Sequence, residues 1–513
     1  MRFCQSILLL VTLLVVATAT QASQELLQQN CMGCHVPAAD GSLSRISGQR
    51  KTPEGWKMTL RRMETVHGIT VGNQEIPIGR STQELVKYLA DTQGLAPSEA
   101  APYRYLIEQR LNHVENFPDE EKYMCGRCHS SGRFALQRRT AEEWDLLVHF
   151  HLGQYPTIEY QMYGRDRDWV AMVFDETVPL LTEKYPFESQ AWDDWQKTEK
   201  PNLAGRWVMS GHMAGQGFVH LVMTTEVAEG DDAYKLTVAG LGPKGEALAG
   251  SGNAIVYTGY EWRGSFDING TPMRMMLAAD ADGNLMTGRM HEKGQALLGM
   301  DVTARRTGEN AIDSVWPGFI GAGEEQVLLI SGRGLSGDVR FADGIAVEEV
   351  LSADENHARV RVKAASDLAP GEVNVVMGQA AGSVKVHGGV NAIAIEPAYA
   401  VARVGGNGPT PELKAAFRAV AMSGEERLGY LSSAAWRVEP FDELAADLQD
   451  VQFAGSIDSV SGVFTPAGAG PNPARVMSTN NAGNLKVIAE SGDLQADGQL
   501  IVTVQVWLDP PLR

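Results

Sequence analysis

Two short stretches of the sequence repeat one five-residue pattern: QQNCMGCHVPA at Gln28–Ala38 and EKYMCGRCHSS at Glu121–Ser131. In each stretch two cysteines flank two other residues, and a histidine follows directly. The chain has 5 cysteines, and four of them lie in these two stretches. Those four are Cys31, Cys34, Cys125 and Cys128. A chain that places its cysteines so selectively uses them for one shared purpose.

The pattern Cys-x-x-Cys-His is the attachment sequence of c-type haem. Two thiols on one helical turn reach the two vinyl groups of a haem, and the imidazole that follows ligates the iron from the proximal side. We therefore predict two covalently bound haem c groups, with His35 and His129 as proximal ligands. A structural zinc site is an alternative use of the same residue types, but zinc does not require a histidine directly after each cysteine pair.

The beginning of the chain predicts export. Residues 7–17, ILLLVTLLVVA, form an apolar run that is too short to span a bilayer, and small residues around Thr20–Ala22 follow it. We predict that residues 1–22 are a secretory signal, cleaved near Ala22. The remaining cysteine, Cys4, precedes the apolar run, whereas a lipid-modified cysteine would follow it. No later segment is apolar enough to insert into a membrane.

The text after each motif also repeats. RKTPEGWKMTLRRM at Arg50–Met63 aligns with RRTAEEWDLLVHFH at Arg138–His151, with the tryptophans offset by 88 residues (144 − 56) and the cysteines by 94 (125 − 31). A threonine before an acidic first turn begins a helix in each copy. Final helices are expected at residues 81–93 and 169–185. The N-terminal part is therefore predicted to be an all-α tandem diheme cytochrome c.

The same alignment suggests the distal ligands. Met63 and His151 each stand seven residues after the tryptophan of their copy. Methionine and histidine both serve as the sixth ligand of a c-type haem, and methionine raises the reduction potential. We predict Met63 for the first haem, with His67 as the rival and core packing as the other explanation. We predict His151 for the second haem, with His149 and then Met162 as rivals.

From about Pro201 the hydrophobic period changes from helical to alternating, and cysteine is absent. Residues 219–240 and 274–291 alternate around turn sequences and predict hairpins. Short strands at regular spacing after Trp316 fit an immunoglobulin-like sandwich. In the last section, residues 410–422, TPELKAAFRAVAM, suggest one helix.

The predicted organisation is multidomain, an all-α tandem cytochrome followed by three all-β domains. The boundaries are 1–22 for the signal, 23–200 for the diheme domain (lobes 23–105 and 106–200), 201–308 for an antiparallel β-barrel, 309–391 for an immunoglobulin-like domain and 392–513 for an immunoglobulin-like β-sandwich. About 500 residues suit four domains.

The β half contains no recognisable catalytic motif, and we predict no catalytic residue in this chain. Removing the signal takes away Arg2 and no acid, so the mature formal charge is 43 − 63 = −20. A strongly acidic exported protein is a poor candidate for binding nucleic acid or anionic membranes. Its surface field could steer a basic redox partner.

The whole chain resembles the α subunit of quinohemoprotein amine dehydrogenase, a bacterial periplasmic enzyme. The resemblance rests on CMGCH and CGRCH, the RxTxExW repeats, LAGRWVMSG at residues 203–211 and VYTGYEWRG at residues 256–264. It also rests on the order of a tandem cytochrome and three β domains.

The resemblance implies a periplasmic heterotrimer with a β-propeller subunit and a small subunit. In that family the small subunit carries a cysteine tryptophylquinone, which oxidises primary amines. Electrons then pass through two haems to an external blue copper protein or cytochrome c. This chain would be the electron relay and would hold no amine-attacking group. A self-contained diheme peroxidase and a stand-alone diheme electron carrier remain alternatives.

Overall fold

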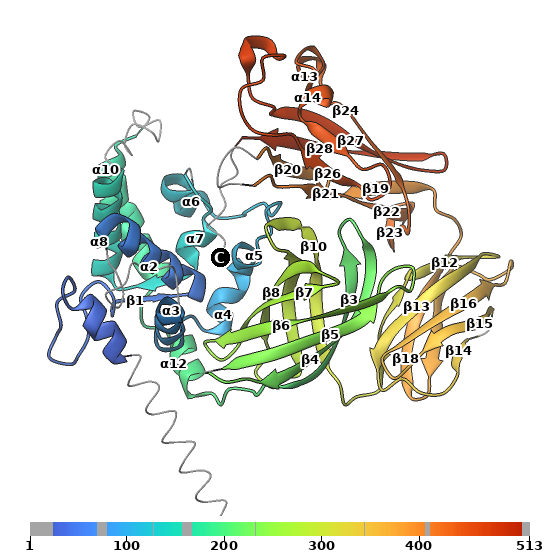
Figure 1. Ribbon diagram of the computed structural model, residues 1–513, viewed down its shortest axis with the longest axis horizontal. Helices are drawn as coiled ribbons and strands as arrows, with labels where there is room; N and C mark the ends of the chain where they lie inside the picture. Colours follow the sequence, from blue (N-terminus) through green and yellow to red (C-terminus); the bar gives the residue numbers. More distant parts are fainter. Residues whose placement is uncertain are drawn as a thin grey trace, which may run out of the picture.

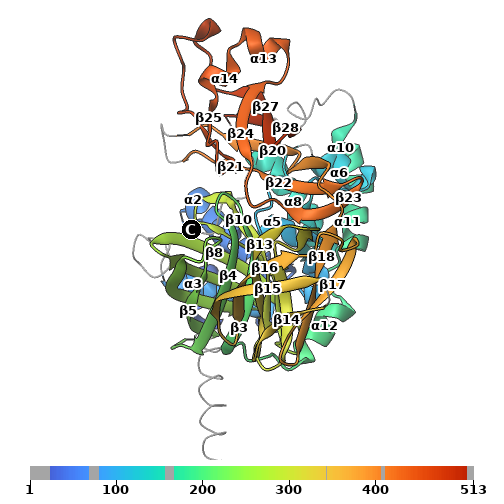
Figure 2. The ribbon, with the colours of Figure 1, turned by 90° about the vertical axis from the view of Figure 1, so that its right-hand side faces the viewer.

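The computed structural model describes residues 24–68, 80–126, 128–155, 167–230, 232–342, 344–405 and 411–504. The predicted signal and Met162 lie outside these residues. A helical part lies on one side of a central β-barrel, one β-sandwich lies on the other side, and a second sandwich lies above the barrel in Figure 1. Figure 2 shows the same arrangement from the side of the first sandwich. The predicted fold class, a helical domain followed by all-β domains, is confirmed.

The N-terminal part is helical apart from two short strands, β1 (Gln49–Lys51) and β2 (Gln137–Arg139). Residues 24–31 are helical and lead into the first motif. The further helices of the first lobe and the connection are α2 (Pro53–His67), α3 (Arg80–Thr92), α4 (Pro97–Ala100), η1 (Ala101–Tyr103) and α5 (Arg104–Ile107). Those of the second lobe are α6 (Asp119–Cys125), α7 (Gly132–Ala135), α8 (Ala141–Gln154), α10 (Trp169–Met172), the π-helical turn η2 (Val173–Thr177), α11 (Val178–Lys184) and α12 (Gln190–Lys197).

The sequence repeat is also a structural repeat. Thr52 and Thr140 both cap their helices by accepting a backbone N–H three residues on, each at 3.2 Å. The indole N–H of Trp56 donates to the Gln93 carbonyl at 3.0 Å, and that of Trp144 donates to the Tyr185 carbonyl at 3.2 Å. Since equivalent side chains make equivalent contacts, the two lobes share one internal design.

A local two-fold axis relates the lobes. Strands β1 and β2 pair antiparallel, and the register places Arg50 opposite Arg138, which are equivalent residues of the repeat (50 + 88 = 138). An antiparallel pair of equivalent strands has two-fold symmetry about its centre. The lobes are therefore joined through a shared two-stranded ladder.

The central β domain is a closed, up-and-down antiparallel barrel in which the strands follow chain order. Its strands are β3 (Gly205–Met213), β4 (Gly217–Val227), β5 (Ala233–Leu241), β6 (Ala247–Tyr257), β7 (Glu261–Ile268), β8 (Thr271–Ala279), β9 (Leu285–Glu292) and β10 (Gln295–Arg306). Both predicted hairpins, β4–β5 and β8–β9, are confirmed. The interior is filled with side chains, among them the buried Trp207 and Trp262 and several methionines.

The next section is a sandwich of two four-stranded sheets around a Val/Ile/Leu core. One sheet has the order β11-β13-β16-β15 and the other β12-β18-β17-β14. The strands are β11 (Ala311–Trp316), β12 (Phe319–Gly321), β13 (Glu325–Arg333), β14 (Val339–Phe341), β15 (Ile345–Ala353), β16 (His357–Ala364), β17 (Gly371–Met377) and β18 (Ala380–His387).

The last section is built from a four-stranded sheet, β20-β28-β27-β24, and two three-stranded sheets, β19-β22-β23 and β21-β26-β25. Its strands are β19 (Ala392–Glu396), β20 (Tyr399–Arg403), β21 (Ala415–Ala416), β22 (Arg418–Ser423), β23 (Glu426–Tyr430), β24 (Ala435–Pro440), β25 (Gly455–Ile457), β26 (Val463–Pro466), β27 (Gly483–Ser491) and β28 (Leu494–Thr503). Short helical segments, α13 (Glu443–Asp447), α14 (Asp450–Phe453) and η3 (Val476–Ser478), lie in the connections.

One prediction in this section is wrong. The described residues of the expected helix 410–422 form β21 and β22, and β22 pairs antiparallel with β19. Leu413, Ala415, Phe417 and Ala419–Ala421 are all buried in this section. A segment with so little polar surface has no solvent face for a surface helix, and packing overrides the helix propensity of its alanines.

The helical part seals one end of the barrel. Trp192 and Trp195 of α12 are buried in the same cluster as the barrel interior, and the Trp195 indole donates to the Thr258 carbonyl at 2.8 Å. On the first lobe, Glu54 forms an ion pair with Arg263 of β7 at 2.6 Å. These contacts fix the position of the lobes against the barrel.

Candidate haem sites

The first motif forms a single helical turn. The backbone N–H of His35 donates to the Cys31 carbonyl at 2.9 Å, which places both cysteines and the histidine on adjacent positions of the turn. Cys31 packs against the core of the first lobe, whereas Cys34 is exposed. The Nδ1 of His35 donates to the Ser44 carbonyl at 2.7 Å. That bond orients the ring and leaves Nε2 as the ligating nitrogen.

The second motif shares the burial pattern and the histidine orientation of the first. Cys125 ends α6 and packs against the core of the second lobe, and Cys128 is exposed. The Nδ1 of His129 donates to the Ser130 carbonyl at 2.8 Å, so its Nε2 is again the nitrogen oriented for a ligand.

In each motif the two thiols lie close to one another. Burial and the neighbouring Cys34 raise the pKa of the Cys31 thiol to about 11. Burial and Cys128 raise the pKa of the Cys125 thiol to about 11 in the same way. The first cysteine of each motif, Cys31 or Cys125, is therefore a neutral thiol in largely apolar surroundings. The second cysteine of each motif is exposed.

The candidates for the distal position of the second site differ in orientation. His151 is half-buried on α8, and its Nδ1 donates to the Leu147 carbonyl at 2.8 Å. Burial lowers its pKa, and the charges of His129 and Arg62 are further causes, so these groups lie within electrostatic reach of it. His149 is exposed and faces Asp145 at 3.4 Å. The structure thus places His151 within electrostatic reach of His129, whereas His149 is exposed.

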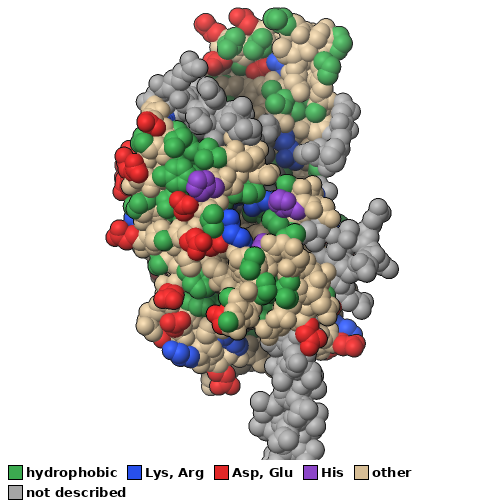
Figure 3. Space-filling view, turned by 90° about the vertical axis from the view of Figure 1, so that its left-hand side faces the viewer, with side chains coloured by type: hydrophobic (Ala, Val, Ile, Leu, Met, Phe, Trp, Pro, Cys, Tyr) green, Lys and Arg blue, Asp and Glu red, His purple; other side chains and the backbone are tan. Residues whose placement is uncertain are grey.

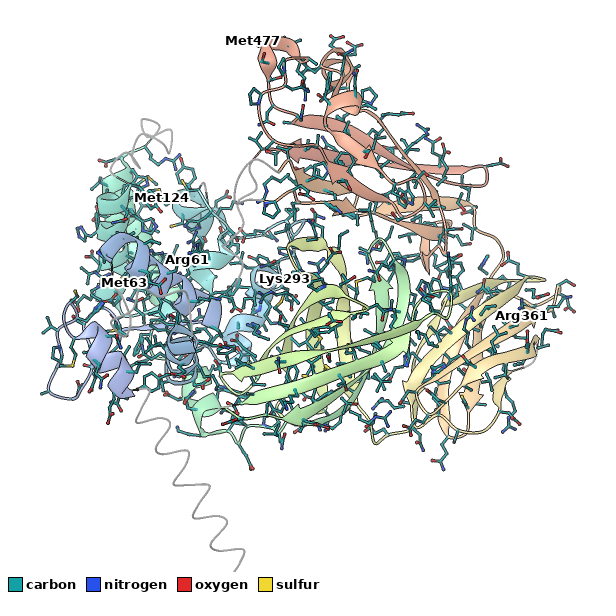
Figure 4. All side chains as sticks on the ribbon, in the orientation of Figure 1. Arg61, Met63, Met124, Lys293, Arg361 and Met477 are labelled. Carbon is teal, nitrogen blue, oxygen red and sulfur yellow. The ribbon has the colours of Figure 1, made fainter. Side chains whose placement is uncertain are left out.

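In the first lobe, Met63 is half-buried on α2, while the rival His67 is exposed in the last turn of that helix. Figure 4 shows Met63 on the first lobe and Met124 on the second. The nearby Leu60 packs against the same core as Cys31. The part of α2 after Trp56 therefore packs against the same core as the first motif.

A band of cations lies between the lobes of this otherwise acidic chain. Its members, which we call the cationic seam, are Arg45, Arg50, Lys51, Arg62, Arg133, Arg138 and Arg139. Within the described residues two carboxylates pair with it. Glu99 binds Arg50 at 2.8 Å and Arg138 at 3.1 Å. Glu143 binds Arg45 at 3.1 Å and lies 3.6 Å from Arg139.

Two carboxylates important to the site do not follow from the sequence pattern. Glu115 accepts the hydroxyl of Tyr105 at 2.6 Å and the N–H groups of Ser131 and Gly132 at 2.7 and 2.8 Å, and it also accepts the Ser130 hydroxyl. It therefore holds the loop that follows the second motif. Glu99 joins the two lobes. Each is a lone glutamate outside the repeat, so no spacing rule identifies it.

The residues fit a covalently attached haem. Each lobe offers two neighbouring thiols and an imidazole with Nδ1 already bonded, and α2 and α8 carry the half-buried Met63 and His151. Figure 3 shows histidines and hydrophobic side chains gathered on the outer face of this domain, with Lys and Arg side chains between them. In the described part of the chain, no three His, Cys, Asp or Glu side chains are placed to hold a metal ion by themselves.

The tandem lobes with their motifs, followed by a barrel and two sandwiches, define a multidomain haem-binding protein. Four family models match the chain in order: the haem-binding domain of quinohemoprotein amine dehydrogenase alpha subunit at residues 21–192, its domain II at 200–307, domain III at 309–387 and domain IV at 393–512. The chain belongs to the family of quinohemoprotein amine dehydrogenase alpha subunits. The resemblance stated from the sequence is confirmed, and the protein is a subunit of an amine oxidoreductase.

A comparison with curated proteins finds no match. Among solved structures, the redesigned β-barrel mFAP1 bound to DFHBI is 14% identical, with 20% of this chain and 94% of that chain covered and a TM-score of 0.18. The zebrafish RET cadherin-like domains 1 to 4 are 12% identical, with 59% and 65% covered and a TM-score of 0.18. Titin domains Z1Z2 in complex with telethonin are 11% identical, with 36% and 91% covered and a TM-score of 0.15. These likenesses are too low to carry an argument.

Among the described helices, none has the length and apolar character needed to cross a bilayer.

Proposed function

We propose that this chain is the periplasmic diheme electron relay of an amine dehydrogenase. The observation that carries the proposal is the repeat itself: two equivalent lobes each hold a Cys-x-x-Cys-His motif whose histidine has Nδ1 fixed by a carbonyl. The haem-binding family match supports it. When bound, each haem supplies a one-electron couple.

The chain's own residues have distinct roles in this proposal. Cys31, Cys34, Cys125 and Cys128 would form the thioether links. His35 and His129 would each ligate one iron, and Met63 and His151 would supply the second protein ligands. The burial of His151 and its Nδ1 bond support it over the exposed His149. The exposure of His67 likewise supports Met63.

The amine chemistry is proposed to occur in a partner. Oxidation of a primary amine with water gives an aldehyde and ammonia and releases two electrons and two protons. A cysteine tryptophylquinone in a small partner subunit would take up both electrons, and a β-propeller subunit would complete the heterotrimer. The electrons would leave this chain one at a time to an external blue copper protein or cytochrome c. The family name, an alpha subunit, supports a multi-subunit enzyme.

The covalent haem count tests the proposal. The denatured wild-type chain should carry the mass of two haems. The double variants Cys31→Ser/Cys34→Ser and Cys125→Ser/Cys128→Ser should each carry one, because each pair anchors its own haem. A wild-type chain with one haem or none, or a cysteine pair whose loss leaves the count at two, would contradict the proposal.

A further inference from the structure

The two helices that carry the candidate distal ligands meet at the local two-fold axis. Arg62 on α2 and Phe150 on α8 are equivalent residues of the repeat (62 + 88 = 150). The Arg62 guanidinium carbon lies 4.7 Å from the centre of the Phe150 ring. Equivalent residues touch each other only where a two-fold axis passes between them. This contact therefore joins α2 and α8 at the axis, one residue away from Met63 and His151.

The contact leads directly into the second site. The centre of the Phe150 ring lies 5.8 Å from that of His151, in an edge-to-face arrangement. Arg62, Phe150 and His151 thus form a continuous row from the first lobe to the candidate ligand of the second haem.

A second contact joins α2 to α7 of the second lobe. The Nη2 of Arg133, which stands four residues after His129, donates to the Sδ of Met58 at 2.8 Å. Met58 lies one turn before Arg62 on α2. The first lobe therefore touches the second site near both its proximal and its distal histidine.

The charge at this junction is not balanced locally. Arg62 is half-buried, and among the described residues the charge acting on it is that of Arg133, with no carboxylate beside it. A fixed positive charge favours the reduced form of a nearby iron, because the reduced form carries one positive charge less. In a half-buried setting this influence is screened less than at the surface.

We propose that Arg62 is a positioning residue that couples the two haem sites, raising the reduction potential of the second haem and holding α2 against α8 through Phe150. The inference rests on the proposed ligation of the second haem by His129 and His151. In this account a residue of the first lobe belongs to the second haem site, so the two lobes function together.

The test is a spectroscopic redox titration of the assembled enzyme. The lower-potential step belongs to the bis-histidine site, because methionine raises the potential of the other. Arg62→Gln should lower the equilibrium constant for reduction at that step roughly tenfold. For a one-electron couple this is a fall in reduction potential of about 59 mV. The size follows from Coulomb's law for a charge on the order of 10 Å from the iron at an effective dielectric constant near 20.

Two further variants separate charge from structure. Arg62→Lys keeps the charge and should restore most of the wild-type value. Arg61→Gln removes the neighbouring charge on the exposed face of α2, labelled in Figure 4, and should leave the step unchanged. Thermal unfolding of each variant shows whether the lobes remain folded. The redox titration and the unfolding measurement do not depend on catalytic turnover.

The outcomes are distinguishable. An unchanged lower step in a folded Arg62→Gln enzyme that still holds two haems overturns the inference and leaves the proposed function standing. If Arg61→Gln shifts the potential of the lower step as much as Arg62→Gln does, the inference is also overturned. The effect would then not depend on the contact between Arg62 and Phe150. A wild-type enzyme whose two haems titrate in one step contradicts the proposed ligation by Met63 and His151, on which the inference rests.

Discussion

At the scale of the residue, the buried carboxylate of Glu99 neutralises two arginines that the repeat places opposite each other. The two-fold axis brings the equivalent Arg50 and Arg138 opposite each other, and both are almost completely buried, 1% and 6% exposed. Glu99 lies between them and also accepts the Ser189 hydroxyl at 2.8 Å. Burial alone would raise the pKa of Glu99, but the hydrogen bond from Arg50 and the charges of both arginines hold it below its usual value.

Replacing Glu99 by Gln should therefore destabilise the protein strongly. Removing one partner of a buried ion pair leaves the other charge uncompensated, which costs about 3–5 kcal/mol, and here two arginines lose their partner. Chemical denaturation of the chain, followed by tryptophan fluorescence, measures the change. Glu183→Gln, an exposed change on α11, is the control and should have little effect. A loss below about 1 kcal/mol in Glu99→Gln, within the range of surface changes, would show that the arginines find other partners.

Sequence reasoning reached the motif residues and both proximal histidines because their chemistry is encoded in a short spacing. It could not reach Glu99, since nothing in PSEA at residues 97–100 distinguishes this glutamate from a solvated one. The sequence also did not predict the contact between Arg62 and Phe150. The offset of 88 shows that the two residues are equivalent in the repeat. Whether equivalent residues touch depends on how the two lobes pack against each other.

At the scale of the element, the capped helices α2 and α8 carry the candidate distal ligands of both sites. Each begins at a threonine whose hydroxyl oxygen accepts a backbone N–H of the first turn. The cation before each cap, Lys51 or Arg139, lies over the tryptophan of the same copy, at 4.9 and 5.5 Å. The start of each helix is thus fixed from two sides, which also fixes the position of the candidate ligand about three turns further along the helix.

The caps should contribute equally in the two lobes. Thr52→Ala and Thr140→Ala should each cost about 1 kcal/mol of unfolding free energy, the usual value of a lost N-cap. Denaturant titration of the whole chain measures both. Thr65→Ala is a matched control on α2, because Thr65 is exposed and its hydroxyl donates only within its own helix. If the control costs as much as the caps, capping is not the cause.

The elements also show where local patterns mislead. The capped helices and the strand hairpins follow from the sequence, because their periodicity agrees with their surroundings. The segment 411–422 contains strands β21 and β22 despite its alanines, because its apolar residues from Leu413 to Ala421 are buried and β22 pairs with β19. The closed form of the barrel likewise depends on β10 pairing with β3, a long-range contact that no local pattern reports.

At the scale of the whole molecule, histidines lie at the joints between the barrel and both sandwiches. His220 of β4 is 1% exposed, and its Nδ1 lies 2.6 Å from the Ser331 hydroxyl of β13, with the His357 ring 5.6 Å away. His212 of β3 lies 4.7 Å from the Tyr430 ring of β23. Burial lowers the pKa of each to about 4, with the charge of His357 contributing for His220 and that of Arg418 for His212.

These depressed pKa values predict acid-sensitive joints. An unfolded histidine binds a proton near pH 6.5, whereas folded His220 does so only near pH 4, so the unfolded state binds more protons between these values. Stability from this group is therefore complete above about pH 6.5 and falls as pH falls toward 4, by up to about 3 kcal/mol for His220.

The stability of His220→Gln should vary less between pH 6.5 and 4 than that of the wild type. The difference between the two curves isolates this histidine from all other titrating groups. His113→Gln serves as the control, because His113 is exposed and stacks on Tyr105 outside the β joints. Parallel curves for wild type and His220→Gln would mean that His220 does not couple the barrel to the sandwich.

The central claim is that this chain carries electrons through two haems and does not itself attack the amine. The most direct measurement is an anaerobic visible spectrum before and after a simple primary amine is added, recorded for the complete enzyme and for this chain alone. We predict that the c-haem bands shift to the reduced form in the complete enzyme and stay oxidised in the isolated chain. Reduction of the isolated chain by amine would contradict the claim. Haems that stay oxidised in the complete enzyme yet respond to dithionite would contradict it equally.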